Sequence, residues 1–137
     1  MPLRLEIGPR DVAGGQVMAA RRTGGKAPLS LDGLASAVGA ELDQIQHGLL
    51  QAAVERRDAA TYRGADKQTL TDVMSGSGGF VYGGYCGSPT CEAEIQETTK
   101  ATIRVLPGEE FQSDPAPEQC LWCAEPAVAE AVWAKAY

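Results

Sequence analysis

Four cysteines are the residues of this chain whose type and spacing could support chemistry. Cys86 and Cys91 are separated by four residues, Cys120 and Cys123 by two, and 28 residues lie between the pairs. Two closely spaced pairs are what a tetrahedral four-thiolate site needs, because each turn presents two sulfurs to one ion. A closed site of this kind leaves no position for a substrate, so the spacing favours a structural zinc ion.

Other uses of these cysteines stay open, namely iron–sulfur ligation, two disulfides or four unrelated buried thiols. The N-terminus has an early acidic residue and no apolar core, so it does not read as a signal peptide. No apolar run approaches the roughly 18 residues of a membrane helix. We therefore expect a cytoplasmic protein with no membrane partner, and reduced thiols there disfavour disulfides. Cys120 and Cys123 are spaced as a redox pair, but no thioredoxin-like strand–helix unit precedes them.

Charge is unevenly distributed along the chain, whose net charge is −6. Residues 1–30 hold five basic and two acidic side chains, whereas residues 107–130 hold six acidic side chains and no basic one. Because Lys and Arg supply affinity for phosphate, any phosphate contact is expected within residues 1–30. Arg21, Arg22 and Lys26 near a turn fit a solvated edge as well as an RNA contact.

Two further features carry little chemistry. His47 is the only histidine; it falls off the apolar face of a predicted helix, so we expect a solvated side chain and no nucleophilic catalysis around it. The glycine-rich stretch 75–79 lacks the Gly-Lys-Ser/Thr ending of a phosphate-binding loop, which favours a flexible connector.

Hydrophobic periodicity predicts the elements that position these residues. Strands are expected at 3–7 and 16–22, followed by a turn at 23–25. A helix is expected over 31–60, with Ser30 as its N-cap. Its apolar face comprises Leu34, Val38, Leu42, Ile45 and Leu49.

The remainder of the sequence mixes short elements. The polar run 61–68 is expected to be a boundary and 107–119 a loop. The pattern predicts helices at 69–74 and 91–98, strands at 80–85 and 102–106, and a closing strand or helix at 127–137.

At this point the sequence resembles a known family. Segment 2–11, with Gln16-Val17, Arg21-Arg22 and Lys26, is similar to the end of the anticodon-binding domain of archaeal- and eukaryotic-type prolyl-tRNA synthetases. The second half of the chain resembles the family's C-terminal zinc-binding domain. The residues that carry this resemblance are Gly78-Gly79-Phe80-Val81, both cysteine pairs, segment 101–105 and the ending Ala134-Lys135-Ala136-Tyr137. The resemblance covers essentially the whole chain, in the right order.

The resemblance implies an α+β chain in three parts. Residues 1–30 would be a remnant of an α/β anticodon-binding domain, 31–66 a connecting helix, and 67–137 a small α+β domain holding zinc through Cys86, Cys91, Cys120 and Cys123. The family's tRNA-contacting segment falls on Arg4, Arg10, Asp11 and Lys26, whose side chains suit guanine edges and phosphate. The terminal carboxylate of Tyr137 would face the catalytic domain.

The sequence departs from a complete enzyme of this family. The class II signature segments that bind ATP are absent, as is the first half of the anticodon-binding domain. We therefore expect a C-terminal fragment of proline–tRNA ligase that is inactive alone, with ATP and Mg²⁺ used only by the parent's catalytic domain. Its expected partners are tRNA-Pro and that domain, within a homodimeric parent. The alternative is a free-standing zinc-binding module that interacts with RNA or protein without catalysis.

Overall fold

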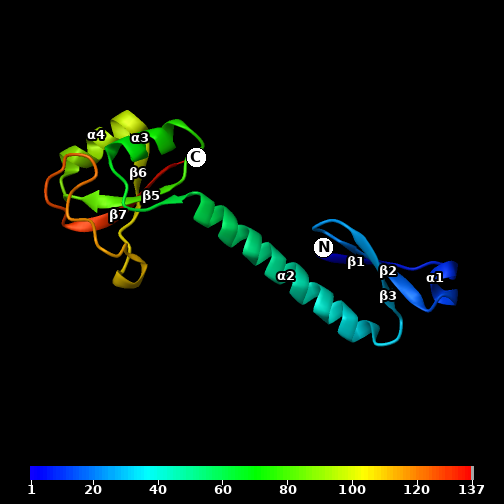
Figure 1. The fold of residues 1–137 in the computed structure, drawn as a ribbon. Helices are drawn as coiled ribbons and strands as arrows, with labels where there is room; N and C mark the ends of the chain where they lie inside the picture. Colours follow the sequence, from blue (N-terminus) through cyan, green and yellow to red (C-terminus); the bar gives the residue numbers. More distant parts are fainter. Residues whose placement is uncertain (137) are drawn as a thin grey trace. The chain divides into compact units, whose positions relative to one another are not determined.

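A computed structural model describes residues 1–136. The chain forms two compact units, Met1–Arg56 and Arg57–Tyr137 (Figure 1). Both units combine helices with a small sheet, which confirms the predicted α+β class and the long helix between the two sheets. Among the described residues, no helix combines the length and apolarity needed to cross a membrane.

The first unit is a three-stranded antiparallel sheet followed by a long helix. Strand β2 is central and pairs with β1 on one side and β3 on the other. The elements are β1 (Leu3–Glu6), α1 (Pro9–Ala13), β2 (Gln16–Arg21), β3 (Lys26–Ser30) and α2 (Leu34–Ala59).

Several predictions for this unit need correction. Helix α1 was not expected, although Pro9 occupies its first turn, where the missing N–H of proline costs nothing. Strand β3 was also missed, because Pro28 argues against a strand except at a sheet edge, which is where β3 lies. The long helix starts at Leu34 rather than at 31, since Gly33 adopts a φ of +68° that a helix cannot contain.

An ion pair joins the sheet of the first unit to α2. Val17 and Ala19 are buried on β2, and Arg21, two residues further on, reaches Glu41 of α2 with its Nη2 at 2.7 Å from the carboxylate. Glu41 and Ile45 are the buried residues of α2. The predicted apolar face of α2 was therefore wrong in part. Ile45 is buried, but Leu42 and Leu49 are exposed, because the buried side of the helix includes Glu41 of the ion pair instead.

The second unit is a four-stranded sheet with two helices on one face (Figure 1). Its strand order is β4-β5-β7-β6, with β4 parallel to β5 and β7 antiparallel to both of its neighbours. The elements are β4 (Thr61–Tyr62), α3 (Lys67–Ser75), β5 (Phe80–Tyr85), α4 (Pro89–Thr99), β6 (Ala101–Val105), the 3₁₀ turn η1 (Glu109–Phe111) and β7 (Ala129–Lys135).

The closing element is thus a strand, one of the two predicted forms. Strand β4 lies inside the run that was expected to be only a boundary. Helices α3 and α4 each begin two residues earlier than predicted, because their N-caps are Asp66 and Ser88. The Asp66 side chain accepts from the Thr69 N–H at 2.8 Å, which satisfies one of the free amide groups of the first turn.

The core of this unit lies between the sheet and the two helices. Side chains alternate across the strands, so β5 sends Val81 and Tyr85 inward and leaves Phe80 and Tyr82 on the other face. Trp133 on β7 is fully buried and meets Tyr85 edge-on, with ring centroids 5.8 Å apart. Because Tyr85 directly precedes Cys86, this packing fixes the point where the first cysteine leaves the sheet.

Candidate functional site

The first cysteine pair lies where β5 turns into α4. Cys86 follows the strand, and Cys91 is in the first turn of the helix. Gly87 between them has a φ of +77°, a conformation that glycine adopts readily. Ser88 caps the helix, its Oγ accepting from the Cys91 N–H at 3.4 Å. The helix N-terminus places partial positive charge near Cys91.

The second pair lies in a tight turn held against β5. Cys120 forms a parallel bridge with Gly84, and the Leu121 N–H donates to the Gly84 carbonyl at 2.9 Å. The turn closes on itself, since the Cys120 N–H donates to Glu125 at 2.8 Å and the Ala124 N–H donates back to Cys120 at 3.1 Å. The sheet therefore carries the second turn directly beside the first.

Gly84 allows this close approach. A Cβ at this position would lie 2.0 Å from the carbonyl oxygen of Gln119 and 3.0 Å from the Cβ of Ala127. Only a residue without a side chain lets the backbone of β5 contact the second turn. The position of Gly84 just before the first cysteine pair fits a tight metal-binding turn, but its close contact with Gln119 beside the second pair could not be read from the sequence.

The structure brings all four predicted cysteines together. Their sulfur atoms all lie within 4.8 Å of one another, and both the Cys91–Cys120 and the Cys86–Cys123 separations are 3.7 Å. Four thiolates around one zinc at about 2.3 Å in tetrahedral geometry would be about 3.8 Å apart.

The same geometry argues against the competing uses of these cysteines. A disulfide needs sulfurs about 2.05 Å apart, and all four cysteines are free. A four-iron cluster holds each cysteine on a different iron atom, which would spread the sulfurs more widely than a single ion does. The donor set therefore fits one tetrahedral ion.

Electrostatics show why a cation suits this cluster. Burial raises the pKa of Cys91, and hydrogen bonds with the neighbouring thiols raise it further. Burial also acts to raise the pKa of Cys120, but the backbone N–H groups of Cys123 and Trp122 outweigh it and lower that pKa to about 7. Four thiolates this close repel one another strongly, so full deprotonation requires a positive ion among them.

Trp122 ties the second turn to the two helices, a role that sequence reasoning missed. Its indole N–H donates to Glu94 of α4 at 3.2 Å, and the Lys67 Nζ lies 3.9 Å from its ring centroid. Such contacts orient metal ligands from outside the coordination shell. Cys123 is exposed while Cys91 and Cys120 are buried, so the cluster lies at the surface end of the core.

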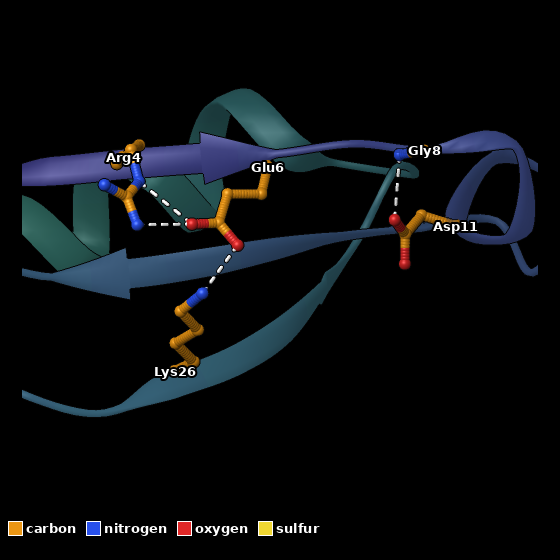
Figure 2. Close-up of polar contacts among 5 residues, drawn as sticks. All are labelled: Arg4, Glu6, Gly8, Asp11 and Lys26. Carbon is orange, nitrogen blue, oxygen red and sulfur yellow. Dashed lines mark hydrogen bonds and ion pairs between the residues drawn. The ribbon is translucent and has the colours of Figure 1, made fainter.

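The structure places two of the four predicted tRNA-contacting residues side by side. Arg4 and Lys26 flank Ala20 in one row across the sheet, on its outer strands. Both bind Glu6, with the Arg4 Nε at 2.9 Å and the Lys26 Nζ at 2.7 Å from its carboxylate (Figure 2). Hydrogen bonds from Lys26 and then from Arg4 lower the pKa of Glu6, which keeps its charge between the two cations.

The other two residues are not in this row. Asp11 accepts from the Gly8 N–H at 2.8 Å and so helps to start α1, away from the Arg4–Glu6–Lys26 group (Figure 2). Arg10 is exposed on α1. Tyr137 lies outside the described residues. His47 is exposed as predicted, and its Nδ1 lies 2.7 Å from the Asp43 carbonyl oxygen.

Comparison with known proteins identifies relatives of the whole chain. A family model described as prolyl-tRNA synthetase, C-terminal, matches residues 68–137. Proteins named proline–tRNA ligase from Lachnoclostridium phytofermentans and Ruminiclostridium cellulolyticum are 36% and 38% identical over 138 aligned residues. The match covers 100% of this chain and 28% of each ligase, so the chain spans a little over a quarter of these relatives' length.

Solved structures show the same fold. A prolyl-tRNA synthetase from Cryptosporidium parvum, complexed with L-proline and AMP, superposes with a TM-score of 0.85 at 23% identity and covers 100% of this chain and 29% of its own. That of Giardia lamblia, in complex with prolyl-adenylate, gives a TM-score of 0.84 at 21% identity, covering 99% and 30%. With a family model matching residues 68–137, relatives along the full chain and four clustered cysteines, the protein belongs to the prolyl-tRNA synthetase family, as a C-terminal part.

Proposed function

We propose that this chain serves a proline–tRNA ligase as its C-terminal part, by contacting the tRNA and by holding a structural zinc ion. The observation that carries the proposal is the match of both units, over the full chain, to ligases of which it spans 28%. In this proposal the parent uses ATP and Mg²⁺ in its catalytic domain to join proline to tRNA-Pro. The isolated chain would be inactive. The parent would be a cytoplasmic homodimer.

The zinc part of the proposal rests on the four sulfurs within 4.8 Å. Cys86, Cys91, Cys120 and Cys123 would hold the ion, which would fasten the turn after β5 to the turn at 120–123 and perform no chemistry on a substrate. Elemental analysis of the purified chain tests this directly. One zinc per chain is expected. A chain without zinc whose four thiols all react freely with a thiol reagent would refute the assignment.

The tRNA part rests on the sheet face that carries Arg4 and Lys26. We propose that these two residues, with Arg10 and Asp11, contact the anticodon region of tRNA-Pro, with Lys26 on phosphate. In a full-length ligase, Lys26→Ala should raise the tRNA concentration needed for charging and leave proline-dependent ATP–pyrophosphate exchange unchanged. A parallel fall in ATP–pyrophosphate exchange would make Lys26 structural and remove its assigned role.

Two parts of the proposal concern the ends and boundaries of the chain. The division into residues 1–30, 31–66 and 67–137 remains our description of its functional parts. Tyr137 would direct its carboxylate toward the parent's catalytic domain, where a buried charge needs a cationic or N–H partner. Adding residues after Tyr137 in the full-length enzyme should then impair proline activation without lowering zinc content. Normal activation by the extended enzyme would leave Tyr137 with a packing role only.

The alternative of a free-standing zinc-binding module is not favoured. Its relatives would be expected to share only the cysteine-bearing unit, whereas the ligases match the three-stranded sheet, the long helix and the cysteine-bearing unit in one alignment.

A further inference from the structure

One face of the four-stranded sheet is not covered by helices. Helices α3 and α4 pack on one side of the sheet, and on the other side the segment around η1 lies against only part of it (Figure 1). That segment is held by Ser113, whose N–H and Oγ donate to Glu130 of β7 at 2.8 and 2.6 Å. The rest of this open face carries side chains from β5 and β6, among them Phe80, which is 44% exposed.

Two hollows meet on this face. One, of about 540 Å³, lies between the loop 76–79 and the end of β7; the other, of about 490 Å³, lies between β5 and the 3₁₀ turn. Both are lined by Phe80 and Arg104, so they adjoin at these two side chains. Together they form an elongated depression, which we call the open-face groove. Its shape suits an extended ligand better than a compact one.

The open-face groove is basic in a chain whose net charge is −6. One acidic residue, Asp58, is among the lining residues, and it pairs with Arg57 at 2.7 Å. Within residues 1–136, Arg104 takes part in no ion pair and no side-chain hydrogen bond. The basic residues that line the groove are Arg57, Arg63, Arg104 and Lys135. This charge suits a polyanion, and the six acidic residues of 107–130 do not line these hollows.

Flat side chains accompany the positive charge. Arg63 stacks on Tyr82, its guanidinium carbon 4.0 Å from the ring centroid, and its Nη1 donates to the Phe111 carbonyl at 3.2 Å. The guanidinium is thus held over the Tyr82 ring, and Arg63 is exposed. Phe80, two residues before Tyr82 on the same strand, and Phe111, 60% exposed, complete the set. Aromatic rings and guanidinium planes on an open sheet are the platforms on which proteins stack unpaired RNA bases.

We propose that the open-face groove binds single-stranded RNA. Phe80 and the Arg63–Tyr82 stack offer surfaces for two bases, and Arg104 lies at the junction of the two hollows, where a connecting phosphate would lie. This site lies in the second unit and involves none of Arg4, Arg10, Asp11 and Lys26, so it is independent of the proposed anticodon contact. A protein partner fits this groove less well than RNA does. A protein would need a separate carboxylate for each of the four cations, whereas the RNA backbone is one continuous polyanion.

The test uses the full 137-residue chain, loaded with zinc, and a short fluorescein-labelled oligoadenylate RNA in an anisotropy titration. Binding should weaken with salt, because each phosphate contact releases counterions. Phe80→Leu, which keeps an apolar side chain but removes the ring, should weaken binding at least about fivefold, since base stacking is lost. Phe80→Tyr keeps the ring and should bind as the wild type does.

Charge controls separate this groove from the first unit. Arg104→Ala should weaken binding and flatten the salt dependence, whereas Arg56→Ala removes the same charge from α2 outside the groove and should change little. Arg4→Ala tests whether the RNA is instead captured by the first sheet. Unaltered zinc content and circular dichroism establish that each variant is folded. The proposal is overturned if the wild type does not bind the RNA, which is the result expected of a face that packs on protein. It is also overturned if Phe80→Leu and Arg104→Ala bind the RNA as tightly as the wild type does.

Discussion

Gly84→Ala tests whether the close backbone approach at β5 builds the metal centre. The new Cβ would lie 2.0 Å from the Gln119 carbonyl oxygen, which is backbone and cannot rotate away. Because an ordinary carbon–oxygen contact exceeds 3 Å, the turn at 120–123 must move by about 1 Å. Metal–ligand distances tolerate only about 0.2 Å, so the second cysteine pair can no longer meet the first without strain.

The magnitude follows from the cost of overpacking. An added methyl group in a close-packed site typically costs about 1–3 kcal/mol, and a metal that binds only the folded site carries that cost as lost affinity. Zinc affinity should therefore fall between about fivefold and about 150-fold. The affinity is measured by competition with a chromophoric chelator, beside thermal unfolding of the zinc-loaded chain.

Gly108→Ala is the matched control for this experiment. Gly108 has a φ of −65°, which alanine adopts easily, and a Cβ there would meet no atom within 4 Å. Its zinc affinity and unfolding temperature should equal those of the wild type. If Gly84→Ala also bound zinc with wild-type affinity, the turn at 120–123 could move without disturbing the cysteines. The close contact at Gly84 would then not be needed to bring the two cysteine pairs together.

The remaining predictions concern single contacts. Ser88→Ala should lower the stability of the zinc-loaded second unit by about 1 kcal/mol in chemical denaturation, because the cap on the Cys91 N–H is lost. Ser77→Ala, in the loop before β5, serves as its control. Glu6→Gln should strengthen binding of tRNA-Pro to a full-length ligase by up to about fivefold in a filter-binding assay, because Arg4 and Lys26 lose their competing partner; weaker binding would mean that Glu6 positions the two cations. The hydrogen bond from Arg21 lowers the pKa of Glu41 below its ordinary 4.5, so its contribution to stability is complete above that value and is lost as the pH falls through the lowered pKa. The protection factors of the β2 amides, which correct for the intrinsic pH dependence of exchange, should therefore fall at acid pH in the wild type and depend less on pH in Glu41→Gln.

The cysteine cluster was predictable because its signal is local. Two short spacings bring two sulfurs together within each turn, and only the meeting of the turns depends on the fold. The fold supplies that meeting through β5, which leads into Cys86 and also pairs with Cys120 at Gly84. Nothing in the spacing of 28 residues between the pairs reveals such pairing, so neither the contact of Gly84 with the second turn nor the supporting role of Trp122 could be deduced.

Apart from the short helix α1, the missed elements were ones that depend on their neighbours. Strand β3 contains Pro28 and forms only because β2 offers a partner at the sheet edge. Strand β4 has two residues, Thr61 and Tyr62, and exists only through parallel pairing with β5. The prediction of the buried face of α2 was wrong in part for a related reason. Periodicity selects apolar residues, but Glu41 is buried in α2 because its carboxylate pairs with Arg21. Local patterns cannot report a partner that is 20 residues away.

The cysteine cluster and the hydrophobic core of the second unit are continuous. Cys91 and Cys120 belong to the same buried cluster as Leu70, Ile95 and Trp133. A charged thiolate within that cluster is costly unless a cation lies beside it, so the ion and the apolar packing depend on each other. Loss of the ion should therefore loosen the contact of α4 with the sheet before it affects the first unit, whose ion pair and sheet share no residue with the cluster. A zinc ion bound by these cysteines would therefore have a structural task at this edge of the core and not a catalytic one.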